Sequence, residues 1–332
     1  MKYLLILSCL LFASVGWSED ININDLVLSN KDGLLYEEFA DIPFTGKVAG
    51  QEKGRIDKGI KIGKWIEYWD NGQLLGKYNY KNGEHDGEQL EYYENGLISR
   101  KVNFKDGKLD GEYIKYYESG QLGIKRNYKD GKHHSEQLQY YDNGQLSKKT
   151  NYKDGKLEGE QLGYYENGQI SRKVNFKDGK LDGEQLEYFE NGQLEIKRNY
   201  KDDKKEGEQL EYFESGQILS KNNYKDGKEE GEQLEYLESG QILSKNNYKD
   251  GKEEGEQLEY LESGQILSKK NYKDGKEEGT EIFTYYKNGQ ILSKSNYKDG
   301  KKDGEYLHYD DEGLLKTHEI YKDGKLTETI KP

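Results

Sequence analysis

Few side chains in this sequence have the types and spacing that catalysis or metal binding requires. The five histidines do not recur at a fixed interval, and a metal on the pair His133 and His134 would need further ligands, so we expect a solvated turn there. No Ser-His-Asp order and no phosphate loop is present, and the spacing from Gly227 to Gly231 is that of turn glycines. The sequence therefore predicts no enzyme, no cofactor and no metal site.

Paired acidic residues do recur, as in Asp226, Glu229 and Glu230. Retaining glycosidases also use two carboxylates, but within a deep substrate cleft, which a flat single sheet does not offer. Calcium is the better functional interpretation of such loops, because hard cations take oxygen ligands. The spacing matches no known calcium loop, and we expect ordinary solvated turns, with calcium as the alternative.

The composition indicates a repeat array and not a compact globule. Of 332 residues only 32% are hydrophobic and 35% are charged, whereas there are 40 glycines and 30 tyrosines. So many aromatic residues exclude a disordered chain. Arrays in which each unit packs only against its neighbours fit this composition. The formal net charge of −13 disfavours nucleic acid and anionic lipid surfaces as partners.

The first residues resemble a cleaved secretory signal peptide, residues 1–18. Lys2 is basic, the run from Leu4 to Val15 is apolar, and small residues precede Glu19. This run is too short for a membrane-spanning helix, so we predict no transmembrane segment. The protein would be periplasmic, on the cell surface or secreted. A lipoprotein anchored through Cys9, the single cysteine, is the alternative, and the mature chain would contain no disulfide.

Glycines reveal that the sequence is internally repeated. Turn glycines recur at 24-residue intervals from Gly72 to Gly264, and a second series starts at Gly83. Residues 255–278 repeat residues 231–254 with one change, Asn246 to Lys270. Units that are copied this freely are interchangeable, which argues against unique chemistry at any one position.

Each unit contains two short strands, which in one unit are residues 209–213 and 217–224. A three-residue turn with Gly216 in the left-handed conformation joins them, and Lys225-Asp226-Gly227 begins a longer return. A loop with an odd number of residues would place Leu210, Tyr212, Ile218 and Tyr224 on one sheet face, together with Leu234 of the next unit.

The predicted fold is all-β, an elongated antiparallel β-meander of about eleven tandem 24-residue hairpin repeats in a single layer. We assign residues 19–62 to an N-terminal capping segment, 63–313 to the repeats, and 314–332 to a C-terminal capping segment.

The repeat pattern resembles that of MORN-repeat proteins. It reads G-E-x-x-x-Y-[YF]-x-[NS]-G-Q-[LI], then K-x-N-[YF]-K-D-G-K, and it is most similar to the MORN-variant group that includes YwqK-family antitoxins. Asp32 to Tyr36 and Ile42 to Val48 resemble the usual opening of that group. The resemblance implies a β-hairpin repeat fold and an antitoxin-like role.

Two sets of side chains are candidates for partner binding. Aromatic residues recur every 24 positions on the second sheet face, where they either complete the packing or form an exposed stripe. Acidic residues accumulate in the C-terminal units and would steer a basic partner. The candidate residues are Trp69, Tyr93, Tyr117, Tyr141, Tyr165, Phe189 and Phe213 in the row, and Glu232, Glu235 and Glu256 among the acids.

The sequence thus predicts an exported, non-enzymatic scaffold for protein–protein interaction, with a basic protein, a toxin or an envelope component as the partner. The alternative is a surface protein that binds glycans or mediates adhesion, in which the aromatic row would stack on sugar rings.

Overall fold

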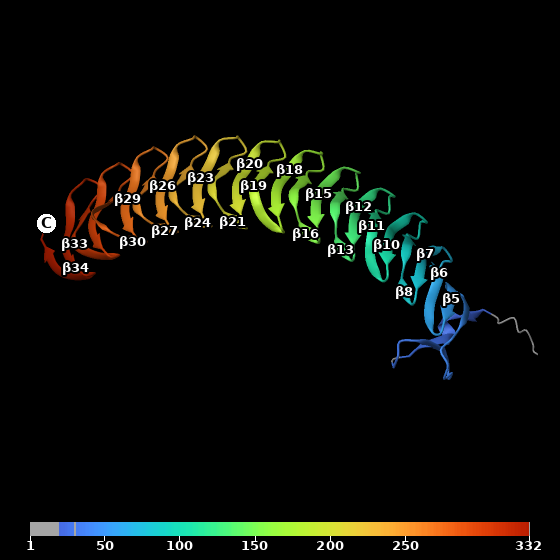
Figure 1. Ribbon diagram of the computed structural model, residues 1–332. Coiled ribbons are helices and arrows are strands. Elements are labelled where there is room, and N and C mark those ends of the chain that lie inside the picture. Colours follow the sequence, from blue (N-terminus) through green and yellow to red (C-terminus); the bar gives the residue numbers. More distant parts are fainter. Residues whose placement is uncertain (1–19, 30, 332) are drawn as a thin grey trace, which may run out of the picture. The chain divides into compact units, whose positions relative to one another are not determined.

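The computed structural model describes residues 20–29 and 31–331, so the predicted signal peptide and Cys9 lie outside the described residues. The described chain is mostly β-strand, with one short 3-10 turn at Ile23–Asp25 (Figure 1). No helix in these two ranges is long and apolar enough to cross a membrane. The chain forms two compact parts, one ending at Lys132 and one starting at His133. These are named the N-terminal section and the C-terminal section.

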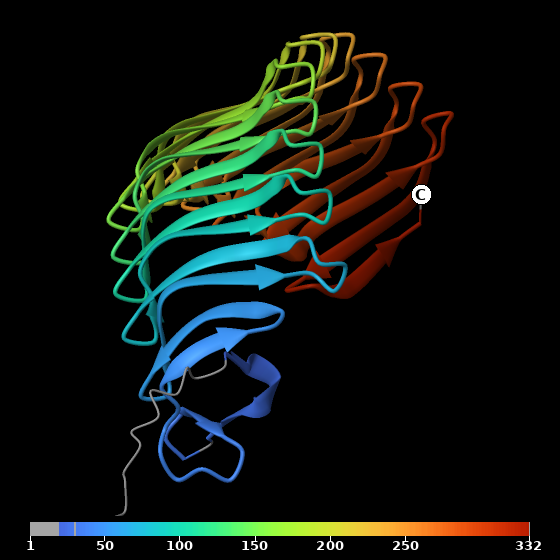
Figure 2. The same ribbon diagram turned by 90° about the vertical axis from the view of Figure 1, so that its right-hand side faces the viewer.

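The C-terminal section confirms the predicted antiparallel meander of hairpin repeats. Each long strand pairs with the next long strand along the chain, and Figure 2 shows the hairpins of each section following one another in sequence order. The long strands are β14 (Ser135–Tyr140), β15 (Leu146–Lys153), β17 (Gly159–Tyr164), β18 (Ile170–Lys177), β19 (Lys180–Tyr188), β20 (Leu194–Lys201), β22 (Gly207–Tyr212), β23 (Ile218–Lys225), β25 (Gly231–Tyr236), β26 (Ile242–Lys249), β28 (Gly255–Tyr260), β29 (Ile266–Lys273), β31 (Gly279–Tyr285), β32 (Ile291–Lys298), β33 (Lys301–Tyr309), β34 (Leu315–Lys322) and β35 (Lys325–Ile330).

Two-residue strands follow many of the tight turns. They are β16 (Lys156–Leu157), β21 (Lys204–Lys205), β24 (Lys228–Glu229), β27 (Lys252–Glu253) and β30 (Lys276–Glu277), and a further one, β13 (Lys132–His133), lies at the division between the sections. Strands β34 and β35 lie in the predicted C-terminal capping segment and continue the antiparallel pairing.

The wide turn of each unit has the predicted three-residue loop. In the unit of β22 and β23, the Phe213 N–H donates to the Gln217 carbonyl and the Gly216 N–H donates to the Phe213 carbonyl, both at 2.8 Å. Gly216 has φ +86°, a conformation that costs glycine little because it has no Cβ. This geometry matches a type I turn followed by a left-handed glycine.

The opposite turn is tighter than the sequence suggested. Lys225 pairs directly with Lys228, so that only Asp226 (φ +51°) and Gly227 (φ +83°) form the loop. Positive φ at both loop residues is the signature of a type I′ hairpin, and Asp-Gly is a favoured pair for it. The return strand is then interrupted at Glu230, which separates β24 from β25.

The predicted sharing of one sheet face by Leu210, Tyr212 and Tyr224 is wrong. Tyr212 pairs with Ile218 as expected, but Glu211 pairs with Ser220, which leaves Leu219 without an opposite residue. This β-bulge reverses the alternation of side chains along the rest of β23. Tyr224 therefore lies opposite Gly207, on the other face from Leu210.

The two faces are named by their residues. The leucine face carries Leu210 and Lys221 in the unit of β22, and the glutamine face carries Gln209, Asn222 and Tyr224. The next unit keeps this arrangement, because Leu234 pairs with Lys221 and not with Tyr224.

The N-terminal section contains the same hairpins and a small core at its start. Strand β1 pairs in parallel with β4, the following strands pair in order, and β2 and β3 form a separate two-stranded sheet. Val48, Ile56 and Trp65 are buried in this core. The strands are β1 (Ile21–Asn22), β2 (Leu26–Leu28), β3 (Leu35–Glu37), β4 (Gly46–Ala49), β5 (Glu52–Asp57), β6 (Ile60–Tyr68), β7 (Leu74–Lys81), β8 (Glu84–His85), β9 (Gly87–Tyr92), β10 (Ile98–Lys105), β11 (Lys108–Tyr116) and β12 (Leu122–Lys129).

Candidate binding surface

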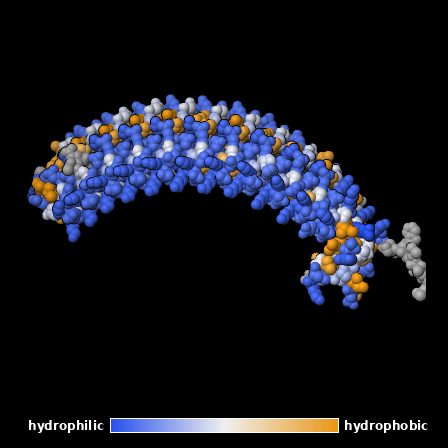
Figure 3. Space-filling view, in the orientation of Figure 1, coloured by the Kyte–Doolittle hydropathy of each residue, from blue (hydrophilic) through white to orange (hydrophobic). Residues whose placement is uncertain are grey.

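Charges on the leucine face are balanced in pairs. In the unit of β22, Lys221 Nζ lies 2.7 Å from a Glu208 carboxylate oxygen, and this hydrogen bond raises the pKa of Lys221. The same pair recurs at 24-residue intervals as Lys101–Glu88, Lys125–Glu112, Lys149–Glu136, Lys173–Glu160, Lys197–Glu184, Lys245–Glu232 and Lys269–Glu256. Because each glutamate has a lysine, this face carries little net charge despite its polarity. Figure 3 shows that the visible surface of the repeats is mostly hydrophilic, with apolar residues along a narrow line.

Buried glutamines replace an apolar core on the other face. Gln209, only 3% exposed, accepts a hydrogen bond from the Asn199 N–H at 3.1 Å and donates one to the Asn199 carbonyl at 3.2 Å. These bonds satisfy the main chain where the facing return strand is interrupted. Gln89, Gln233 and Gln257 repeat both bonds with Asn79, Asn223 and Asn247.

Aromatic rings that include Tyr224 and Tyr248 form a column along the glutamine face. One further side chain lies between successive rings. In the unit of β23, Tyr224 pairs across the tight turn with Glu229, and the next ring along the column is Tyr248. We name the intervening position the gap position. It is occupied by Lys61, His85, Leu109, His133, Leu157, Leu181, Lys205, Glu229, Glu253, Glu277, Lys302 and Leu326.

Where the gap residue is lysine, its ammonium group lies over the next ring of the column. Lys205 Nζ is 4.6 Å from the Tyr224 ring centroid, and Lys302 Nζ is 5.0 Å from that of Tyr321. Lys302 Nζ also lies 3.6 Å from the Tyr306 ring. These are cation–π distances, so the space between two rings accepts an ammonium group.

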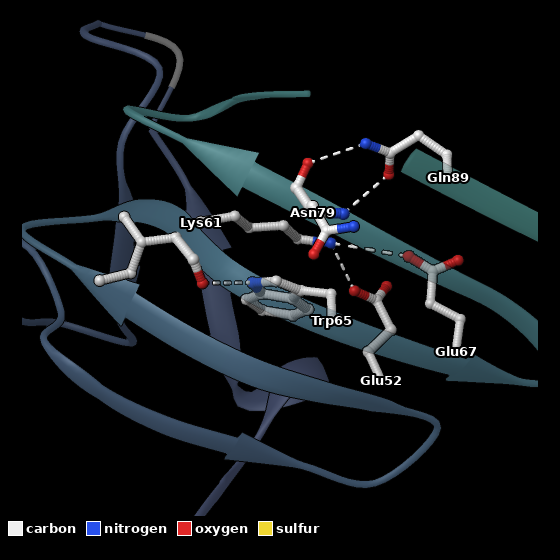
Figure 4. A network of polar contacts seen from close by, with 7 residues as sticks. Glu52, Lys61, Trp65, Glu67, Asn79 and Gln89 are labelled. Carbon is white, nitrogen blue, oxygen red and sulfur yellow. Dashed lines mark hydrogen bonds and ion pairs between the residues drawn. The ribbon is translucent and has the colours of Figure 1, made fainter. Parts of the chain in front are cut away.

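Lys61 shows the most complete form of this arrangement (Figure 4). Its Nζ lies 4.2 Å from the Trp65 ring and 5.6 Å from the Tyr80 ring. Two carboxylates complete the surroundings, with Glu52 at 2.5 Å and Glu67 at 3.9 Å. At this gap position the ammonium group is thus held by rings and carboxylates together.

Three successive units carry glutamate at the gap position, and Lys270 is the one lysine described as acting on these carboxylates. Burial of the ring and the nearby carboxylates of Glu253 and Glu277 raise the pKa of Tyr272 to about 12. Burial also raises the pKa of Glu253, and Glu277 and Glu229 add to this effect while Lys270 opposes it. Lys270 Nζ lies 3.8 Å from Glu277.

The predicted aromatic row lies at the wide turns, and the three tyrosines for which the hydrogen bond is described use their hydroxyls to join neighbouring units. Tyr93 donates to the Tyr116 carbonyl at 2.6 Å, Tyr141 to the Tyr164 carbonyl at 2.7 Å, and Tyr165 to the Tyr188 carbonyl at 2.5 Å. The predicted row members are all half-buried: Trp69, Tyr93, Tyr117, Tyr141, Tyr165, Phe189 and Phe213. The row therefore contributes to packing, and its rings keep part of their surface exposed.

The three predicted acids do not lie together. Glu232 and Glu256 belong to the ion pairs of the leucine face, with Lys245 and Lys269. Glu235 pairs with Ser244 on the glutamine face and accepts its hydroxyl at 3.0 Å.

Among the recurrent acidic residues, the one that directly precedes the first glycine of β25 or of an equivalent strand accepts a hydrogen bond from the next tight turn. Glu230 accepts a hydrogen bond from the Asp250 N–H at 2.8 Å. The described residues contain no group of three His, Cys, Asp or Glu side chains suited to a metal ion. The gap glutamates Glu229, Glu253 and Glu277 were not recognised from the sequence as a set, although they recur every 24 residues, each five residues after a tyrosine.

The model of the MORN repeat variant matches ten stretches of this sequence: residues 61–82, 86–106, 109–130, 134–154, 157–178, 181–202, 205–226, 229–250, 253–274 and 280–299. The chain belongs to the MORN repeat variant family. Its MORN repeats make it a scaffold for interactions.

Comparisons with individual proteins are less informative. No curated protein matches the sequence. A crystal structure of TcdB2-TccC3-TEV is 14% identical, with a TM-score of 0.16, over 82% of this chain and 16% of that chain. A structure of a Photorhabdus luminescens Tc holotoxin pore is also 14% identical, with a TM-score of 0.14, over 87% of this chain and 16% of that chain. This chain therefore spans about one sixth of the length of those toxin chains. Similarities this distant support no conclusion about function.

Proposed function

We propose that this MORN-repeat chain is an exported, non-enzymatic scaffold that binds a protein partner with a basic surface. The observation that carries the proposal is the run of gap glutamates Glu229, Glu253 and Glu277. Their charge is not balanced in the way that the leucine face is balanced, so this surface attracts cations. A basic toxin is one partner of this description, which would give the protein an antitoxin- or immunity-like role.

Export and partner binding have separate tests. Mass spectrometry of the protein purified from its native host is expected to find an N-terminus at Glu19, in a fraction outside the cytoplasm. For binding, the chain is immobilised and exposed to an extract of that host. We expect a basic protein that is released between about 0.1 and 0.5 M salt, since screening weakens exposed charge pairs. A partner that is neutral or acidic, or that stays bound at high salt, would contradict the proposal.

A second candidate function is binding to a glycan through the aromatic row. The supporting observation is that Tyr141 and Tyr165 are held at their hydroxyls one repeat unit apart, with exposed Gln145 and Gln169 beside them. Aromatic rings beside amide groups are suited to stacking and hydrogen bonding with sugars. Sedimentation with insoluble cell-wall glycan tests this candidate, and loss of sedimentation in Tyr141→Ala/Tyr165→Ala would support it.

A further inference from the structure

The glutamate units have a carboxylate at the gap position where the lysine units have an ammonium group. In the lysine units, the ammonium group of Lys205 or Lys302 reaches the next ring of the column. The corresponding next ring is Tyr248 for Glu229 and Tyr272 for Glu253. Among the described side chains of these units, the tyrosine column has carboxylates between its rings, and Lys270, which acts on Glu253 and Glu277, is the ammonium group found there.

The gap at Glu229 keeps two of the four groups that surround Lys61, whereas Ser220 and Gln233 take the places of Glu52 and Trp65. Lys61 lies near Glu67, six residues further along, and near the Tyr80 ring. Glu235 stands six residues after Glu229 and is also on the glutamine face. A cation brought from outside would therefore meet two carboxylates and the Tyr248 ring. Ammonium and guanidinium groups are the protein cations that bind aromatic rings in this way.

The spacing of the gaps restricts the conformation of the partner. Neighbouring strands lie about 4.8 Å apart, so that successive gaps, two long strands apart, are separated by roughly 9.6 Å. A polyproline-II helix rises about 3.1 Å per residue with three residues per turn, which places every third side chain on one side at roughly 9.3 Å. An extended β-strand would point every third side chain to alternate sides.

We propose that the tyrosine–glutamate column of residues 224–297 binds a polyproline-II segment of a partner protein that carries lysine or arginine at every third position. The inference rests on the proposed function and names the structural class of the basic partner. Each basic side chain lies over one tyrosine ring and next to one gap glutamate, Glu229, Glu253 or Glu277.

The test is a calorimetric titration of the full chain with two synthetic peptides at about 0.15 M salt, where long-range steering is largely screened. One peptide is (Lys-Pro-Pro)4 and the other is (Lys-Pro-Pro-Pro)4, which has the same charge but the wrong spacing. We expect the first to bind at least about tenfold more tightly, since each correctly placed cation adds a favourable contact. Equal affinities would overturn the proposal.

Two triple variants separate a local site from net charge. Glu229→Gln/Glu253→Gln/Glu277→Gln removes the gap carboxylates and is expected to weaken (Lys-Pro-Pro)4 at least about tenfold. Glu208→Gln/Glu232→Gln/Glu256→Gln changes the net charge equally, in the same units, on the leucine face, and is expected to keep the affinity within about twofold. Circular dichroism checks that both variants are folded. If the two variants weaken the peptide equally, only net charge attracts it and the proposal fails.

A gain of affinity gives a second, independent readout. Lys205→Glu removes the lysine that occupies the preceding gap and creates a fourth site for the fourth lysine of the peptide. We expect tighter binding by about threefold or more, whereas Lys204→Glu, the same charge change at an exposed neighbouring residue, is expected to have little effect. No difference between these two variants would contradict the assignment of the gap as the cation site.

Failure of this inference and failure of the proposed function are distinguishable. A basic partner captured from the host whose binding is unchanged in the gap triple variant would preserve the proposed function and refute the column as its site. Absence of any basic partner, together with spacing-dependent peptide binding, would preserve the column and refute the function.

Discussion

Two stretches of the C-terminal section share a backbone and differ in how they use their side chains. Residues 135–188 have Leu157 and Leu181 at the gap position and tyrosines at the wide turns. Residues 207–277 have glutamates at the gap position and Phe213, Leu237 and Leu261 at the wide turns. The strand register is the same in both, as Gly159 opposite Phe176 and Gly207 opposite Tyr224 illustrate.

The comparison shows that the same positions of the repeat can either stabilise the sheet or carry charge. In the first stretch, leucines fill the gaps and Tyr141 and Tyr165 bond to the next unit. In the second stretch, half-buried carboxylates stand between rings, and the raised pKa of Glu253 indicates that burial disfavours its charge. Binding sites often carry such unfavourable local interactions. We therefore expect the second stretch to be locally less stable and to be the part that binds.

The largest expected effect concerns the repeat unit that both stretches share. Deleting residues 231–242, about half a unit, removes one strand, so that each later strand would need to run in the opposite direction. The leucine and glutamine faces could not then continue in register. We expect loss of cooperative unfolding and of most β-sheet circular dichroism.

Deletion of the whole unit, residues 231–254, is the matched control. It joins Glu230 to Gly255, which stands in an almost identical unit. The stability of repeat arrays is roughly a sum of unit and neighbour terms, so the chain should remain folded. Equal damage from both deletions would show that the glycine-defined unit is not the structural module.

A smaller effect is expected for the bonds between units in the first stretch. Tyr141→Phe and Tyr165→Phe each remove one hydroxyl bonded to a carbonyl 23 residues away. Each should lower the free energy of unfolding by about 1 kcal/mol, measured by urea denaturation. Tyr212→Phe on the leucine face serves as the control, because its hydroxyl makes no cross-unit bond within the described chain. The converse variant Phe213→Tyr should add such a bond to the second stretch, and a neutral result there would weaken the comparison.

The smallest effect is expected on the leucine face. Glu160→Gln in the first stretch and Glu232→Gln in the second each break one lysine–glutamate pair. The side chains of both pairs are more than a third exposed, so each change should cost about 0.5 kcal/mol or less, and the two values should agree. Thermal unfolding at low and high salt measures them. A clearly larger cost in one stretch would show that the stretches differ beyond the gap position and the wide turn.

The fold could be predicted from the sequence because glycine spacing determines where the chain turns. Gly216 and the Asp226-Gly227 pair require positive φ, and their regular recurrence along the chain fixes the hairpin. The assignment of faces could not be predicted, since the unpaired Leu219 creates a bulge that leaves no mark in the residue types. One extra residue was enough to move Tyr224 to the other face.

The candidate site was only partly predictable for a similar reason. Glu229 and Glu230 are adjacent and identical in type, yet Glu230 caps the tight turn after β26 and Glu229 stands between two rings. The sequence left open whether the aromatic row completes the packing or forms an exposed stripe, and the hydroxyl of Tyr93 bonds to the backbone of the next unit. Which carboxylates are paired depends on strand register, and register depends on the bulge.

One variant tests most directly whether the gap glutamates exchange stability for binding. Glu229→Leu/Glu253→Leu/Glu277→Leu gives the second stretch the gap residue of the first. Each leucine should add roughly 1 kcal/mol by burying apolar surface and removing a half-buried charge. Thermal unfolding and titration with (Lys-Pro-Pro)4 are measured on the same sample. We predict a melting temperature higher by a few degrees, about 2 °C or more, together with at least about tenfold weaker binding. An unchanged or lower melting temperature, or an unchanged affinity, would contradict the claim that the gap glutamates lower stability and bind the partner.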